Sequence, residues 1–273
     1  MSKYIINGFR EISSDDFFGE VKGIEVDNVY NTQVFNNAVE KINNEKIEFY
    51  LSNDYDLTIL KHCPTIRYIA ISGEADLSIL YDLPTIEGVK IGWLFGNNEK
   101  FDFSRLMNLR QLQIPYTKKN KSLFQLPNLV RLCITEYKEK DLQQLKAFVG
   151  LQDLIISMST LNNLQGIENM PSLQRLTLDY CLRLKDISNL AEVKNLKELC
   201  VSDCNNIEKI ESTLSKLISL ERLILWTLET KGGVLQNLDF IHDMKSLNEI
   251  NCSWRIKKRD EEALKRLKTA MLF

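Results

Sequence analysis

Apolar residues recur along the chain at a spacing of three positions and then two. Leu173, Leu176 and Leu178 show this pattern, and it returns many times. A helix would place apolar residues three and four positions apart, whereas alternation is typical of a strand with one face in a core. Each pattern therefore predicts an inward turn followed by a short strand. Ten such strands are predicted, with their last inward residues 20 to 27 positions apart at Leu51, Ile71, Ile91, Ile114, Ile134, Ile156, Leu178, Val201, Leu225 and Cys252, and an eleventh at Val26.

A second apolar group follows each predicted strand after a turn. Leu164 with Ile167, and Ile187 with Leu190, are examples. The interval leaves room for only one or two turns of helix, and several of these segments end at Pro or Asn. A unit of strand, turn and return segment that repeats at a nearly fixed period predicts a solenoid.

The two ends of the chain depart from this period. We expect an N-terminal cap at residues 1–45, about ten repeats at residues 46–256 and a C-terminal capping helix at residues 257–273. In the first cap, Tyr4–Ile6 suggests a strand, and a helix is predicted from apolar residues spaced three and four apart at Phe35, Ala38, Val39 and Ile42. The last helix would start with the acidic residues 260–262 and bury Ala263, Leu264, Leu267, Ala270 and Met271.

The figure L-x-x-L-x-L-x-x-C/N-x-x-L, with return segments such as Leu184–Leu190, resembles the leucine-rich-repeat family and its short-repeat, internalin-like subclass. The resemblance implies an α/β fold: a right-handed solenoid, shaped as a horseshoe or arc, with a parallel β-sheet on the concave face and short helical or irregular convex segments. The Asn of the family is replaced by Cys181 and Cys204 in two repeats, which leaves its hydrogen-bonding ladder incomplete. Compact members of such a family would serve as scaffold, regulatory or inhibitor (immunity-type) subunits.

Composition narrows the class of protein. The 273 residues are 44% hydrophobic with a net charge of −2, so we expect no broadly basic nucleic-acid binder. No apolar run is long enough for a signal peptide or a membrane span. Six scattered cysteines form no C-x-x-C pair, which favours a reducing, cytoplasmic setting without a metal site. We expect Cys181 and Cys204 to be buried thiols stacked in adjacent repeats.

No residue pattern points to catalysis. His62 and His242 lie in return segments without a nucleophile beside them, and phosphate-binding glycine motifs are absent from the sequence. Cys200 has Glu198 as a neighbour, which gives no cause for a lowered thiol pKa. We therefore expect a protein that is not an enzyme and that needs no cofactor.

Successive side chains of a strand point to opposite faces of the sheet, so the residues between the inward ones are predicted to face outward on the concave side. Equivalent outward residues of neighbouring strands then form columns across the sheet. The first outward column alternates in charge along the last six strands, at Arg131, Asp153, Arg175, Glu198, Arg222 and Glu249. This column either binds a partner through its charges, or its opposite charges pair between neighbouring strands and set the register of the repeats. The second interpretation is favoured, because each arginine has carboxylate neighbours.

The middle and third outward columns carry an apolar group. Ile155, Thr177, Cys200 and Ile224 would stand side by side, with Trp226 next to them, and this makeup is typical of an interface hot spot. The alternative is that the loop containing Gly232 and Gly233 folds back over Trp226. Cys133 would share this face, whereas Trp93, Phe95 and Trp254 have the parity of core or rim residues.

These columns lead to a hypothesis of function. We expect the concave face to bind another protein without catalysis, as a monomer, with a homodimer as the alternative, and to bind neither nucleic acid nor membrane. The alternatives are a recognition or accessory module of an enzyme system, and a ligand or nucleic-acid sensor. The predicted partner-binding residues are Ile155, Thr177, Cys200, Ile224, Trp226, Arg131, Arg175, Arg222, Tyr50, Tyr68 and Lys90.

Overall fold

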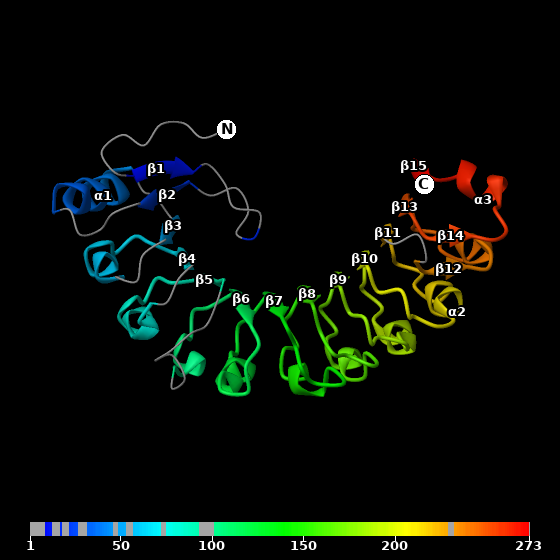
Figure 1. The fold of residues 1–273 in the computed structure, drawn as a ribbon, viewed down its shortest axis with the longest axis horizontal. Coiled ribbons are helices and arrows are strands. Elements are labelled where there is room, and N and C mark those ends of the chain that lie inside the picture. Colours follow the sequence, from blue (N-terminus) through cyan, green and yellow to red (C-terminus); the bar gives the residue numbers. More distant parts are fainter. Residues whose placement is uncertain are drawn as a thin grey trace. The chain divides into compact units, whose positions relative to one another are not determined.

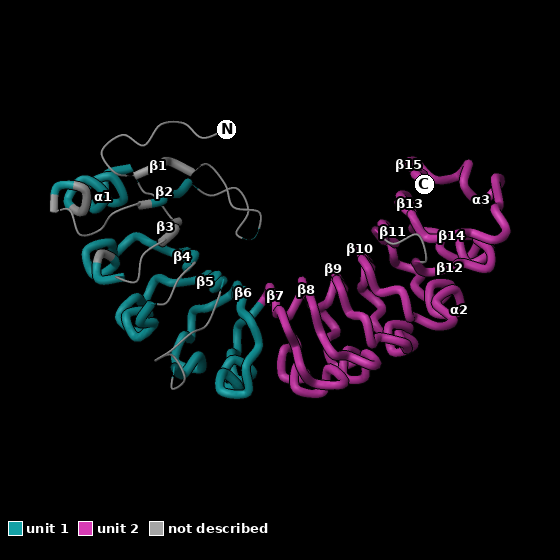
Figure 2. Tube along the Cα trace, viewed as in Figure 1, with its two compact units in different colours: residues 1–129 teal, residues 130–273 magenta. Residues whose placement is uncertain are grey.

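The computed structural model of the chain forms two compact units, residues 1–129 and 130–273 (Figure 2). Within them the structure describes residues 9–12, 17, 22–26, 32–45, 49–52, 57–71, 75–92, 101–228 and 232–272. The strand suggested at Tyr4–Ile6, and the residues Trp93 and Phe95, lie outside this described part.

The first unit is built from neighbouring strands with short helices between them (Figure 1). Its strands follow one another in the sheet in chain order, as β1 (Phe9–Ile12), β2 (Gly23–Val26), β3 (Phe49–Ser52), β4 (Tyr68–Ile71), β5 (Gly88–Ile91) and β6 (Gln111–Pro115). The β1–β2 pair is antiparallel, and the pairs from β2 to β6 are parallel. The helices are α1 (Thr32–Asn44) and the 3₁₀ turns η1 (Thr58–His62), η2 (Leu77–Asp82), η4 (Phe103–Arg105) and η5 (Lys121–Gln125).

The second unit repeats the same plan. Its parallel strands stand in the order β7 (Arg131–Thr135), β8 (Asp153–Ser157), β9 (Arg175–Asp179), β10 (Glu198–Ser202), β11 (Arg222–Trp226), β13 (Glu249–Cys252) and β15 (Thr269–Leu272). The return segments are η6 (Gln143–Leu145), η7 (Ile167–Asn169), η8 (Ser188–Glu192), α2 (Ile210–Leu214) and η9 (Asp239–His242), followed by α3 (Glu261–Lys265). A small second sheet pairs β12 (Val234–Leu235) with β14 (Arg255–Ile256).

The core lies between the sheet and the return segments, as the apolar pattern predicts. In the second unit, Leu176 and Leu178 of β9 are 1% and 0% exposed, and equivalent inward residues stand directly opposite them on β8 and β10. Leu164 and Leu190 from the return segments are fully buried on the other side of the same core. Burial of one such side chain contributes about 1.5–3 kcal/mol, so the stacked rows of leucine and isoleucine are the main source of stability.

Cysteine takes part in hydrogen bonds where the strands turn toward the return segments. The buried thiols of Cys181 and Cys204 are stacked in adjacent repeats, as expected, and the Cys181 N–H donates to Cys204 Sγ over 3.3 Å. The Ser159 hydroxyl donates to Cys181 Sγ over 3.0 Å from the preceding repeat. Ser159, Cys181 and Cys204 therefore form a short ladder of weak hydrogen bonds at positions where the sequence lacks the Asn of the repeat pattern.

Two sequence-based expectations about the fold are wrong. In β3, Leu51 and not Tyr50 pairs with Ala70, and Tyr50 pairs with the core residue Ile69. The C-terminal helix α3 ends at Lys265, and the residues beyond it form β15. The N–H groups of Lys268 and Thr269 donate to the Asn248 carbonyl, so pairing with β13 satisfies backbone groups that a longer helix would have taken.

Candidate binding site on the open face of the sheet

In the second unit, the sheet face that points away from the return segments carries the predicted outward columns. We call it the open face. The register aligns the charged column without a slip from Arg131 on β7 to Glu249 on β13. The same register places Ile155, Thr177, Cys200 and Ile224 side by side in the middle column.

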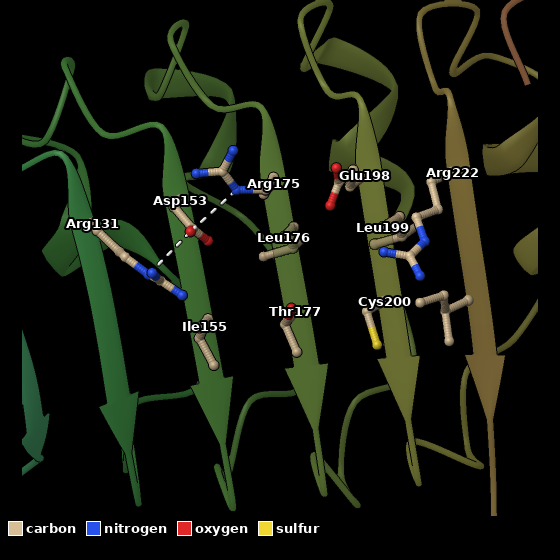
Figure 3. A pocket seen from close by; sticks show the side chains of 11 residues that line it. Arg131, Asp153, Ile155, Arg175, Leu176, Thr177, Glu198, Leu199, Cys200 and Arg222 are labelled. Carbon is tan, nitrogen blue, oxygen red and sulfur yellow. Dashed lines mark hydrogen bonds and ion pairs between the residues drawn. The ribbon is translucent and has the colours of Figure 1, made fainter. Parts of the chain in front are cut away.

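A buried carboxylate joins two arginines at one end of the charged column (Figure 3). Asp153 is only 4% exposed, and its Oδ2 lies 3.1 Å from Nε of Arg131 and 3.2 Å from Nε of Arg175. A buried charge needs a partner, because its desolvation is otherwise expensive. The cluster Arg131–Asp153–Arg175 therefore contains two guanidinium groups and one carboxylate, and its net charge is positive.

The rest of the column is paired differently. Arg222 Nε lies 3.1 Å from Oε1 of Glu249 on the next strand. Glu198, between Arg175 and Arg222, is exposed, and no other described residue holds its carboxylate by a hydrogen bond or an ion pair. The column therefore neutralises itself only in part, with a cationic end at β7–β9 and an unpaired acid on β10.

The charged and middle columns together enclose a hollow of about 210 Å³ on the open face. Seven of the predicted partner-binding residues line it: Arg131, Arg175, Arg222, Ile155, Thr177, Cys200 and Ile224. Figure 3 shows the charged side chains along one end of the hollow and Ile155, Thr177 and Cys200 farther along the same strands. The hollow thus has an apolar part and a charged margin, which is the usual makeup of a binding pocket.

The thiol in the hollow has a raised pKa. Cys200 is partly exposed, whereas the other five cysteines are buried and all six are free. Burial raises the pKa of the Cys200 thiol, and the nearby Asp179 raises it further, against a smaller opposing effect of Arg222. The expectation of an unactivated thiol is thus confirmed. Cys133 stands beside Ile155 in the middle column, as expected, but is only 7% exposed.

Comparisons with solved structures identify the architecture. An internalin (inlF) from Listeria monocytogenes aligns over 86% of this chain and 72% of its own, with a TM-score of 0.56 and 17% identity. The chain has the leucine-rich-repeat fold. A TLR13 chain in a complex with ssRNA13 aligns over 88% of this chain, with a TM-score of 0.54 and 18% identity. The solenoid spans only 41% of that TLR13 chain. No family model and no curated protein sequence matches the chain.

Trp226 stands at the end of β11, outside the lining of the hollow. It pairs with Ser202 on β10 and is partly exposed. The two glycines that would cover it in the alternative interpretation lie against other residues, because a β-carbon on Gly232 would touch Thr227 and one on Gly233 would touch Trp254. Trp254 itself is 1% exposed, which confirms its prediction as a core or rim residue.

Of the partner-binding residues predicted in the first unit, Tyr68 is buried. Tyr68 is 8% exposed with the Arg67 guanidinium 5.4 Å from its ring centre, so the expectation of an accessible ring is wrong. The parity argument assumed that one face of β4 is open, but all four of its residues are buried. Lys90 is partly exposed, and the altered register of β3 removes Tyr50 from the column of Lys90.

Sequence reasoning missed two features of the second unit. The first is the burial of Asp153, for which the only signal was its place between two arginines. The second is a set of large apolar side chains just beyond the strand ends: Met158 and Tyr180 are 55% and 47% exposed, and both have positive φ. Left-handed backbone disfavours such residues, so these two positions carry a local conformational cost.

Other kinds of site were searched in the described ranges. Among these residues, no group of three or more His, Cys, Asp or Glu is arranged to hold a metal ion. Within the same part of the chain, no helix is both long enough and apolar enough to cross a membrane.

Proposed function

We propose that the chain is a non-catalytic binding protein whose open face, centred on the hollow of β7–β11, binds another protein. The single observation that carries this proposal is the hollow itself, in which a row of partly exposed apolar side chains lies beside arginines. Apolar contacts bordered by arginine are the usual makeup of the energetically dominant part of a protein interface. The leucine-rich-repeat fold supports the proposal because solenoids offer an extended, preformed surface.

Two chemical observations support a role without catalysis. Asp153, the most buried acid of the hollow, is engaged by two guanidinium groups. The raised pKa of the Cys200 thiol leaves little of the nucleophilic thiolate at neutral pH.

The six free cysteines support the proposed cytoplasmic setting.

A nucleic-acid partner is the second candidate, because the TLR13 structure of the same fold is a complex with ssRNA13. In this chain, however, Arg131, Arg175 and Arg222 already face carboxylates. Nucleic-acid binding usually needs a surplus of cations and falls steeply with salt. A protein partner is therefore preferred.

Affinity capture with a pair of matched variants tests the proposal. The bait proteins are the wild type, Ile224→Glu in the hollow and Ile218→Glu, a 61% exposed isoleucine in the turn before β11. We expect mass spectrometry to identify a protein that the wild type and Ile218→Glu retain from a lysate of cells that produce the chain, and that Ile224→Glu loses. Trp226→Ala tests whether the interface extends to the strand end.

Three outcomes would overturn the proposal. A protein that the wild type and Ile224→Glu retain equally would place the interface elsewhere. Equal loss with both glutamate variants would show a general effect of added charge. Capture that a nuclease treatment abolishes would favour the nucleic-acid alternative. A sedimentation measurement on the pure chain separates a homodimer, which would bury the hollow between two copies, from the expected monomer.

A further inference from the structure

The Arg131–Asp153–Arg175 cluster has hydrogen-bonding capacity that the described protein does not use. Arg175 binds Asp153 through Nε, and its Nη groups have no hydrogen-bond acceptor among the described residues. Nearly half of the Arg175 side chain (47%) is exposed. A guanidinium fork with two unoccupied donors fits a carboxylate in a bidentate geometry.

The position of Asp153 keeps this fork in place. Because Oδ2 of Asp153 is shared with Arg131, one carboxylate oxygen serves two cations, and Arg175 is only partly neutralised. Asp153 is held in a nearly inaccessible position, so an incoming anion meets the arginine and not the acid. On the other side, Glu198 repels an anion and so directs it toward the β8–β9 side of the fork.

The apolar part of the hollow lies two residues farther along the same strands. Arg175 and Thr177 are both on the open face of β9, and Thr177 stands between Ile155 and Cys200. Two residues of strand span about 7 Å. A volume of about 210 Å³ lies below the range of pockets for drug-sized ligands, so it suits a single side chain.

We propose that this hollow recognises an acidic residue and an apolar residue spaced two positions apart in an extended segment of a partner protein. The carboxylate of the segment binds the Nη groups of Arg175, and the apolar side chain enters the hollow between Ile155, Thr177 and Cys200. In an extended segment, residues i and i+2 point to the same side and are about 7 Å apart, which matches the spacing on β9. The inference rests on the proposed function, because it specifies what the same hollow reads.

Three blocked tripeptides serve as probes. The first has glutamate, glycine and phenylalanine in this order, the second replaces glutamate with glutamine, and the third replaces phenylalanine with glycine. Binding to the whole chain is measured by NMR titration, and the site is located by the changes in the methyl resonances of Ile155 and Ile224, which line the hollow. We expect the first peptide to bind at least about tenfold more tightly than either of the others. The second peptide has lost a charge-assisted hydrogen bond to Arg175, and the third has lost the apolar side chain that would be buried in the hollow.

Three variants assign this preference to residues. Arg175→Gln should remove the preference for glutamate over glutamine, whereas Arg183→Gln, an exposed arginine in the turn after β9, should keep it. Glu198→Gln should strengthen binding of the glutamate peptide severalfold, because it removes a repelling charge. Circular dichroism of each variant checks that the chain is folded.

Several results would overturn the inference. Equal affinity for the glutamate and glutamine peptides, or a preference that survives Arg175→Gln, would exclude the carboxylate contact. Unchanged Ile155 and Ile224 resonances on addition of the first peptide would exclude the hollow as the apolar contact. If a captured partner is lost with Ile224→Glu but unaffected by Arg175→Gln, the proposed function stands and this inference fails. If no partner depends on Ile224, the proposed function itself fails.

Discussion

Arg175 and Asp153 form an ion pair between neighbouring strands, with Nε and Oδ2 3.2 Å apart, in which only the carboxylate is buried. Arg131 on β7, the neighbour of β8 on the other side, lies close to the same oxygen. The buried charge of Asp153 thus depends on two cations that remain partly solvated. This asymmetry covers the acid and leaves part of the Arg175 guanidinium exposed on the open face.

Removal of the Asp153 carboxylate should destabilise the second unit. Asp153→Ala leaves two guanidinium groups facing each other without a counter-charge. We expect a loss of about 1–3 kcal/mol in the free energy of unfolding, below the 3–5 kcal/mol typical of a fully buried pair because water screens both arginines. Urea denaturation followed by circular dichroism measures the change.

The matched control for Asp153 is Glu198→Ala. Glu198 belongs to the same column, is exposed and has no partner in the described structure. Its removal should change the free energy of unfolding by less than about 0.5 kcal/mol. Similar losses for both variants would show that the ion pairs of Asp153 contribute no more to the free energy of unfolding than an exposed, unpaired acid does.

Most of the solenoid could be predicted because its pattern is local and repeated. Leu176 and Leu178 alternate with polar residues, so only one face of β9 can be buried, and the same holds for its neighbours. In β3 this information is missing. Phe49, Tyr50 and Leu51 are all apolar, so either parity is acceptable, and the pairing with β4 decides the register.

Non-local contacts explain the other differences. Ala270 and Met271 suit a helix or a strand, and the free backbone edge of β13 decides in favour of a strand. For the candidate site, alternation of charge predicted the column but not its pairing. Asp153 is buried whereas Glu198 is exposed. This difference depends on the direction in which the neighbouring arginine side chains point, and the local sequence pattern does not predict that direction.

The turn after β8 offers a test of backbone strain. Met158 has a φ of 52° and is 55% exposed. Asn tolerates left-handed backbone better than Met, so Met158→Asn should raise the free energy of unfolding by about 0.5–1 kcal/mol. The control is Met107→Asn, an equally exposed methionine that is not among the residues with positive φ. A gain of the same size at Met107 would attribute the effect to polarity and not to backbone strain.

A glycine in the last repeats is required by close packing. A β-carbon on Gly233 would lie 2.2 Å from Cδ2 of the buried Trp254. Gly233→Ala should therefore lower the free energy of unfolding by about 1–3 kcal/mol, as the indole must move inside a packed core. Gly150→Ala is the control, since a β-carbon there would meet nothing within 4 Å. Thermal unfolding of both variants measures the difference, and equal melting temperatures would contradict the predicted clash.

The acid that begins α3 should make the C-terminal end of the solenoid sensitive to low pH. Asp260 accepts a hydrogen bond from the Ala263 N–H over 3.1 Å and lies 2.8 Å from Nε2 of His242. The Ala263 N–H first, and His242 second, lower the pKa of Asp260 below its usual value of 3.8. A lowered pKa in the folded state means that the ionised form stabilises the fold.

This contribution is complete above the pKa of the unfolded chain and is lost as the pH falls through the lower folded value. We therefore expect the wild type to be more stable than Asp260→Ala at about pH 5–6, and this difference to shrink as the pH falls below about 4. Hydrogen exchange of the α3 amides at several pH values measures it locally. Asp243→Ala, at an exposed acid after η9, serves as the control and should leave α3 protection unchanged. A difference that persists undiminished at pH 3 or below would show that the Asp260 side chain acts by packing and not through its charge.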